Sequence, residues 1–496
     1  GRYADALEKL ETVLSLGKHN SVALGLKAAI LRKLGKNAEA KAIAENARAY
    51  DLLDLRAIFE LSHFEDMTDT IAYFAEKAEN IIDIAAEYIS EGLLDDALYT
   101  LDFAPQSYPL VSYYRAYTLS LMGRDNTSEI EKAEACHHGY CFPNRISDII
   151  VLESVISSCK KSANASYYLG CLFYNKERYD DAISAWERCV SVDPEKAEAY
   201  RNLALAYFDK RGDAEKAKVC MKTALDTKKT SPRMLMEYQQ LLKNTNTSPE
   251  ERLAVYEEYP ELFAKRDDCY LDKVILLTLM GKYKESIELA AAKRFHIYEG
   301  GEGRLTKQHS WMFLLYALKL ENEGLTDEAE EYFKRATIIP KSYGEAKTFF
   351  NQEAHIYFYL GQMLEKLGRA DDALKAFEEA SIYKAAVSEL SAFRALALRK
   401  LGRENEADEV TSEMLAVADE RITNSDLRTY YGVGSPSPMP FENNIVKNNL
   451  LSGYILKAFA LRANGDSEGA DKYICLAEEI APFAFEVHAY RAIFTK

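Results

Sequence analysis

The residues with the clearest chemical potential lie in a glycine-rich stretch, residues 294–303, which reads RFHIYEGGEG. Arg294, His296, Glu299 and Glu302 lie close together there. Two carboxylates beside an imidazole could hold a metal ion or the hydroxyl groups of a polyol. A phosphate-binding loop is excluded, because no Lys-Ser or Lys-Thr pair follows the glycines and the glutamates would repel phosphate. The alternative is a plain turn, since glycine supplies positive φ where a loop bends sharply.

A second stretch that could contact a ligand is residues 430–441, which reads YYGVGSPSPMPF. Its alternating prolines cannot continue a helix and favour an extended backbone. With Tyr430, Tyr431 and Phe441 at its ends, this segment could lie along a groove or cover a pocket. The alternative is a rigid spacer packed by its own aromatic side chains.

The sequence gives little support for a metal-binding site or for a catalytic nucleophile. Residues 136–141, CHHGYC, offer four potential zinc ligands, but a structural zinc site draws ligand pairs from two separated segments and no second cluster follows. No residue stands in a nucleophile–base context. We therefore expect no metal, no other cofactor and no catalytic residue in this chain. The eight cysteines are scattered, which is typical of reduced thiols in a cytoplasmic protein.

The elements that position these residues follow a period of about 34 residues. In residues 163–196 the small residues Gly170 and Ala182 allow two helices to approach closely, and Phe173 and Trp186 fill the space between them. Glycines that mark the turn between two helices recur at Gly35, Gly92, Gly123, Gly281, Gly324, Gly368, Gly402 and Gly465.

This pattern resembles the tetratricopeptide repeat, a pair of antiparallel helices joined by a tight turn. The resemblance predicts an all-α fold, a right-handed α-solenoid of about ten helix pairs plus unpaired helices. Extra helices are expected near residues 55–63 and 148–161, and a capping helix over 483–494. The chain opens in the turn between two helices, so we expect it to be a piece of a longer protein.

Deviations from the period divide the chain into seven predicted parts. They are N-terminal repeats with a truncated first repeat (1–135), an irregular linker and helix (136–162), central repeats (163–293), the glycine-rich insertion (294–309), C-terminal repeats (310–422), the proline-rich insertion (423–449), and the last repeat with its capping helix (450–496).

The repeat register also predicts which side chains line the concave groove, because fixed positions of each first helix face it. The groove residues predicted in this way are Asn164, Tyr167, Tyr174, Asn175, Arg201, Asn202 and Phe208. Only Asn202 matches the carboxylate clamp of the chaperone-binding repeats, so an acidic chaperone tail is not the expected ligand.

The net charge and the hydrophobic content of the chain argue against several classes of binding partner. The chain has 496 residues and a formal net charge of −16, which argues against nucleic acid and anionic lipid as partners. The longest apolar run, residues 274–280, is far shorter than the roughly 20 residues that span a bilayer. With 48% hydrophobic residues the chain can bury a large core.

A narrower resemblance rests on six segments. They are residues 142–145 (FPNR), 168–170 (YLG), 201–203 (RNL), 266–268 (RDD), 299–303 (EGGEG) and 430–441. These segments resemble the tetratricopeptide half of a bacterial family whose upstream half is a large domain of unknown function. The resemblance implies an upstream β-rich domain similar to those of sugar-processing proteins.

The sequence therefore favours a non-catalytic scaffold that binds a protein partner or its own upstream domain. The alternative hypothesis is the accessory half of a carbohydrate-active protein, which contributes residues 294–303 or 430–441 to a sugar-binding site. The identity of the partner does not follow from the sequence.

Overall fold

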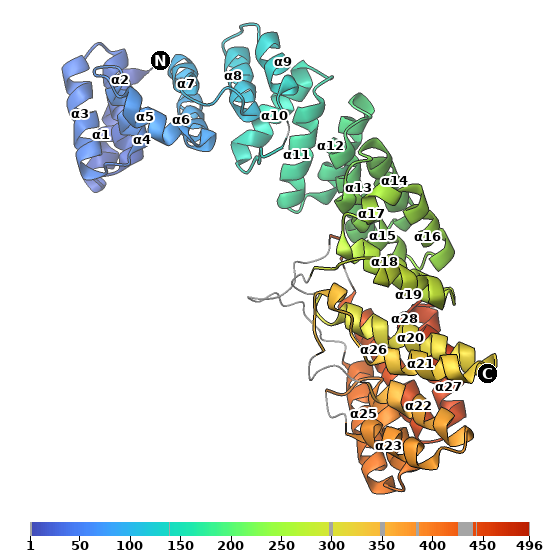
Figure 1. Cartoon of the computed structure of the whole chain (residues 1–496). Coiled ribbons are helices and arrows are strands. Elements are labelled where there is room, and N and C mark those ends of the chain that lie inside the picture. The colour runs from blue at the N-terminus through green and yellow to red at the C-terminus, as the bar shows by residue number, and fades with distance from the viewer. Residues whose placement is uncertain are drawn as a thin grey trace. The chain divides into compact units, whose positions relative to one another are not determined.

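The structure is a computed structural model that describes residues 2–137, 139–296, 301–347, 353–382, 386–424, 440–442 and 444–495 (Figure 1). Regular structure in these ranges is helical throughout, so the all-α prediction is confirmed. The chain divides into two compact units, Gly1–Ala206 and Tyr207–Lys496, and the division falls inside helix α13. The seven finer boundaries expected from the sequence stay predictions.

The first unit contains twelve helices and the start of α13 in the residues described. They are α1 (Tyr3–Leu16), α2 (Ser21–Lys33), α3 (Asn37–Tyr50), α4 (Leu55–Leu61), α5 (Thr68–Ala75), α6 (Ala78–Ser90), α7 (Leu94–Leu101), α8 (Pro109–Leu121), α9 (Thr127–Ala135), α10 (Ile146–Ser158), α11 (Ala163–Asn175), α12 (Tyr179–Val192) and α13 (Ala197–Arg211). The extra helices expected near 55–63 and 148–161 correspond to α4 and α10.

The second unit continues with shorter and longer helices in the same order along the chain. They are α14 (Ala214–Thr227), α15 (Pro232–Asn244), α16 (Pro249–Glu258), α17 (Pro260–Phe263), α18 (Asp267–Leu279), α19 (Tyr283–Ala291), α20 (Arg304–Asn322), α21 (Thr326–Ala336), the 3-10 turn η1 (Lys341–Tyr343), α22 (Ala354–Lys366), α23 (Ala370–Ser381), α24 (Ser391–Lys400), α25 (Glu404–Thr423), α26 (Ile445–Ala463), α27 (Ser467–Ile480) and α28 (Phe485–Phe494).

Helix pairs form where the sequence places a small residue opposite a large one. A Cβ atom added to Gly170 on α11 would lie 2.5 Å from Cδ1 of Trp186 on α12. The same arrangement recurs in the second unit, where a Cβ at Gly361 on α22 would lie 2.7 Å from Cε1 of Phe377 on α23. The eight glycines expected to mark turns have φ between 67° and 84°, which an L side chain rarely adopts. The predicted pairing of helices is therefore confirmed.

The core of the second unit is aromatic and is closed by its last helix. Phe393 on α24 stacks on Phe494 of α28 with ring centroids 6.0 Å apart, and it also contacts Phe459 of α26 at 6.1 Å. Figure 1 shows α28 beside α20, although the two helices are far apart in the sequence. The last helix is therefore present where the sequence placed it, and its capping role stays a prediction. No helix within the described residues is both long enough and apolar enough to cross a membrane.

Candidate functional site

The described part of the glycine-rich insertion is anchored to the residues around it. The side chains of Arg294, His296 and Glu302 are exposed, and Glu299 lies outside the described residues. The backbone N–H of His296 donates to Oδ2 of Asp267 at 2.7 Å, and that of Gly303 donates to Oε2 of Glu345 at 2.9 Å. These contacts tie the described residues on either side of 297–300 to Asp267 and Glu345.

The space beside this insertion is small. A cavity of about 20 Å³ is lined by residues that include His296, Asp267 and Glu345, and a volume of this size accommodates a water molecule but not a sugar ring. Burial alone would raise the pKa of Asp267, but the N–H of His296 and the ammonium of Lys293 outweigh it, so the pKa is lowered. Ligand binding through Arg294, His296, Glu299 and Glu302 stays a prediction.

The proline-rich insertion ends at a buried aromatic anchor. Phe441 has no exposed surface and packs edge-on against Phe208 of α13, with ring centroids 5.5 Å apart. Its carbonyl accepts a hydrogen bond from Nε2 of Gln240 at 3.3 Å. The next N–H, of Glu442, donates to Oδ1 of Asp209 at 2.9 Å, and burial raises the pKa of Asp209 to about 6. The ring of Phe441 therefore holds the segment in place instead of facing a ligand. Tyr430 and Tyr431 lie outside the described residues.

Five of the predicted groove residues form a partly exposed face on the first unit. Tyr167, Tyr174, Arg201 and Asn202 are half-buried, and Asn175 is exposed. Nδ2 of Asn202 on α13 lies 3.7 Å from Sγ of Cys171 on α11, which brings the two first helices together. We refer to these five residues as the first-helix face.

Asn164 is not part of this face. Its side chain is 5% exposed, its N–H donates to Oε2 of Glu134 at 2.8 Å, and its Nδ2 donates to the carbonyl of Glu134 at 2.9 Å. The ammonium of Lys196 donates to the Asn164 amide oxygen from the other side. The amide therefore ties α11 to the end of α9, because its position at the start of α11 points it into the preceding helix pair.

The cysteine–histidine stretch does not assemble a metal site in the described residues. Cys141 is buried, and burial raises the pKa of its thiol to about 12. A zinc ligand needs the opposite shift, because the thiolate is the form that binds zinc. No group of three His, Cys, Asp or Glu that could hold a metal ion occurs among the residues described, and His138 is outside them.

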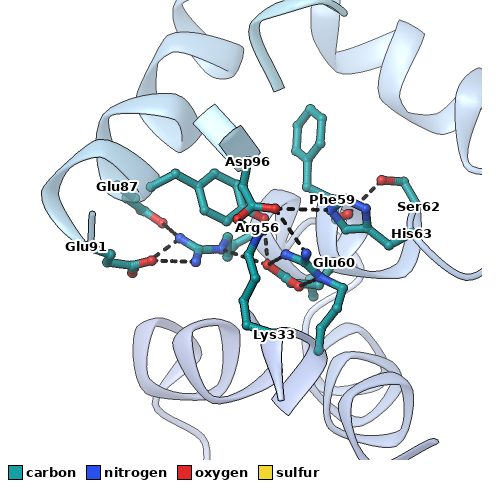
Figure 2. Close-up of polar contacts among 12 residues, drawn as sticks. Lys33, Arg56, Phe59, Glu60, Ser62, His63, Glu87, Glu91 and Asp96 are labelled. Atoms are coloured by element: carbon teal, nitrogen blue, oxygen red, sulfur yellow. Dashed lines mark hydrogen bonds and ion pairs between the residues drawn. The ribbon is translucent and has the colours of Figure 1, made fainter. Parts of the chain in front are cut away.

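A dense cluster of charged groups in the first unit was not anticipated from the sequence (Figure 2). Arg56 on α4 donates to Oε2 of Glu91 at 2.6 Å and to Oε2 of Glu87 at 3.3 Å. Glu60, which has no exposed surface, accepts from Nε of Arg32 at 2.9 Å and from the hydroxyl of Tyr88 at 2.6 Å.

The basic and acidic side chains of this cluster form ion pairs with one another. Burial opposes the charged form of Arg56, but the electrostatic contributions of Tyr88, Glu91 and Glu60 outweigh it and raise the pKa. Asp96 on α7 is 3% exposed and lies 2.8 Å from Nζ of Lys33. We interpret the cluster as a structural connection between α2, α4, α6 and α7, since the opposite charges within it satisfy one another.

A cavity of about 660 Å³ lies in the second unit. Phe208 and Glu442, which hold the end of the proline-rich insertion, are among its lining residues. Its other walls come from the turn between α15 and α16, the first turns of α20 and α26, and the turn between α27 and α28. The structure therefore brings one predicted groove residue and one end of the predicted insertion to a common cavity.

Comparison with known proteins identifies the repeat directly in part of the chain. A family model described as TPR repeat matches residues 170–210. This stretch is similar to a tetratricopeptide repeat. It covers the second half of α11, all of α12 and nearly all of α13, and it contains four of the five residues of the first-helix face, the exception being Tyr167.

Solved structures match the chain at low identity and low TM-score. MamA from Desulfovibrio magneticus RS-1 is 19% identical, covering 38% of this chain and 97% of MamA with a TM-score of 0.24. A tetratricopeptide repeat protein from Parabacteroides merdae ATCC 43184 is 14% identical, covering 65% and 98% of the two chains with a TM-score of 0.24. YrrB, described as a TPR protein with an unusual peptide-binding site, is 14% identical, covering 46% and 96% with a TM-score of 0.19. Identities and TM-scores this low carry no argument about what this chain binds.

Proposed function

We propose that this chain is a non-catalytic scaffold that binds a protein partner on the first-helix face. The partner is either a separate protein or an upstream domain of the same polypeptide. The observation that carries the proposal is the partly exposed row of aromatic and polar side chains on α11 and α13, of which all but Tyr167 lie in the stretch that matches the repeat family.

The aromatic part of the face is held rigidly from behind. The ring of Tyr174 packs 5.6 Å from Trp186 and 5.1 Å from Tyr179. A tyrosine whose position is already set loses little conformational freedom when a partner covers it. Tyr and Arg are also the residue types that most often dominate protein interfaces. Tyr174 and Arg201 are therefore the expected anchors.

The nearby thiol is unsuited to nucleophilic chemistry. Burial raises the pKa of Cys171 to about 11, so this thiol stays protonated at neutral pH. A protonated thiol is a poor nucleophile, and binding is the role that the side chains of this face support.

The proposal is tested by changing the charges of side chains on the face while leaving the packing between the two helices intact. The double variant Asn175→Lys/Arg201→Glu changes the face, and the matched control Ser184→Lys/Arg188→Glu changes exposed positions on α12. Each protein is used as bait in the cell that makes it, and the captured proteins are quantified.

We expect at least one captured protein to fall by about tenfold or more with the face variant and to be retained with the control, since losing a hot-spot contact costs 2 kcal/mol or more. Equal capture by wild type, face variant and control would remove the basis of the proposal.

A further inference from the structure

The cavity in the second unit has the size of a small-molecule site. Its volume of about 660 Å³ falls within the range of roughly 300–1,000 Å³ that is usual for such sites. Aromatic side chains, Phe208, Phe483 and Phe485, contribute apolar surface to the walls, and Asn244 and Asn246 contribute amide groups. This combination of apolar walls and a few polar groups is typical of ligand pockets.

The charge on the walls is opposite to that of the whole chain. The chain contains 78 acidic and 62 basic residues, yet the charged lining residues are mostly basic. The basic lining residues are Lys243, Arg252, Arg304, Lys307 and Lys447, and the acidic ones are Glu442 and Glu486. A cavity lined mainly by one sign of charge concentrates ligands of the other sign.

Several of these charges are already matched by neighbours. Arg252 donates to both carboxylate oxygens of Asp272 at 2.9 and 2.7 Å. Lys307 lies 2.9 Å from Glu389 and 3.0 Å from Glu486, and Glu442 accepts from Lys210 at 2.5 Å. Both acidic lining residues are therefore neutralised, which reduces their repulsion of an anion.

Two lysines on the walls form no close ion pair, although Lys243 interacts electrostatically with the carboxylate of Glu486. The ammonium groups of Lys243 and Lys447 form no ion pair with any residue in the described part of the chain. Lys243 lies at the end of α15 and Lys447 in the first turn of α26. Both side chains are exposed and neither ammonium group is held in an ion pair, so both can contact an anion in the cavity.

Helix ends add to this preference. The first turns of α20 and α26 both face the cavity and neither contains an acidic residue. The N-terminus of a helix carries partial positive charge and usually attracts Asp or Glu from its own first turn. Here those first turns contain basic residues instead, namely Arg304, Lys307 and Lys447. The partial charge of the helix ends and the charge of the side chains therefore both favour a negatively charged ligand.

We propose that this cavity binds a small molecule carrying carboxylate or phosphate groups, with Lys243 and Lys447 as its charge contacts. The volume of about 660 Å³ fits a small molecule, and the binding experiment below distinguishes it from an acidic protein segment. The inference is independent of the proposed first-helix face, since the cavity lies wholly in the second unit.

Isothermal titration of the full chain in 0.15 M NaCl tests the inference, with pyrophosphate and citrate as probes for the two kinds of anion. We expect saturable binding of at least one probe at one site per chain. The double variant Lys243→Met/Lys447→Met should weaken it by about 150-fold or more, since each of the two charged hydrogen bonds contributes about 1.5–3 kcal/mol.

The matched control is Lys319→Met/Lys472→Met, which removes two exposed lysines of the same unit that do not line the cavity. It should bind as wild type does, and so should the face variant Asn175→Lys/Arg201→Glu. Two results with the small probes would overturn the inference. The first is that neither probe binds, and the second is that the cavity variant and the control bind a probe equally well. Binding of hexaglutamate without binding of either small probe would also overturn it, because the ligand would then be an acidic peptide.

Discussion

At the scale of single residues, the packing of Gly170 against Trp186 sets how closely α11 and α12 approach. The indole Nε1 donates to the carbonyl of Tyr167 at 3.2 Å, so the ring cannot move aside without losing this hydrogen bond. The spacing in the sequence predicted both residues, because one side chain must be small for the other to fit. It did not predict the role of Phe441, whose partner Phe208 lies more than 200 residues away.

Gly170→Leu should destabilise this helix pair by about 1–3 kcal/mol, because the added side chain has no space beside Trp186. Hydrogen exchange of α11 and α12 measures the change locally and should become faster. Ser184→Leu, an exposed substitution on α12, serves as the control. Exchange rates that match wild type in both variants would show that the two helices do not pack as described.

A buried histidine makes the second unit sensitive to acid. His355 has no exposed surface, and burial together with the charge of Lys307 lowers its pKa from 6.5 to about 3. Below pH 6.5 the unfolded chain therefore binds a proton that the folded chain does not, and stability falls as the pH falls. Between pH 7 and pH 5 this histidine alone should cost about 2 kcal/mol.

His355→Phe should make the loss of stability between pH 7 and pH 5 smaller by that amount. Urea denaturation followed by Trp311 fluorescence, in a Trp186→Phe background, reports on the second unit. His296→Phe is the control, because its side chain is 82% exposed. An unchanged pH dependence in the His355 variant would mean that this imidazole is not kept neutral by burial.

At the scale of helices, the charge cluster of Figure 2 connects α4 to its neighbours. The repeat pattern located α4 as an extra helix but could not show what holds it. The reason is physical: Glu60 and its partners Arg32 and Tyr88 are each 28 residues apart in the sequence, and charged residues are too common in this chain to indicate a pair.

Removing the carboxylate at the centre of the cluster should be costly. Glu60→Leu leaves Arg32 and Arg56 without the buried anion between them, and breaking a buried ion pair by removing one partner costs about 3–5 kcal/mol. Thermal denaturation of the first unit should show a clear fall in Tm. Glu11→Leu removes the exposed partner of Lys27 and should change Tm little. Similar effects of the two substitutions would contradict the structural role of the cluster.

At the scale of the whole molecule, the division into two compact units predicts that a destabilising substitution in one unit affects only the helices of that unit. In a stack of repeats most contacts join neighbouring helix pairs, and the sequence-distant packing of α28 on α20 lies within the second unit, so damage in one unit should stay in that unit. Glu60→Leu should therefore speed hydrogen exchange in α2 to α7 and leave α20 to α28 unchanged. Faster exchange throughout both units would show a single cooperative fold.

The same organisation explains which features of the fold and of the candidate sites could be predicted from the sequence. Helical content, turn glycines and helix pairs repeat locally, so a period of about 34 residues was sufficient to place them. The cavity in the second unit combines Lys243 with Lys447 and the turn before α28, and no local pattern joins positions so distant. The face on α11 and α13 lies between these cases, since the repeat register predicted its residues but not that Asn164 is buried.

The central claim, that the first-helix face binds a protein, is tested most directly by site-specific photo-crosslinking in the cell that makes the protein. A benzophenone amino acid replaces Asn175 on the face in one variant and Arg188 on α12 in the other, both of which are exposed positions. We expect a discrete crosslinked protein or domain with the probe at 175 and little with the probe at 188. The absence of an adduct at 175, or equal adducts at both positions, would contradict it.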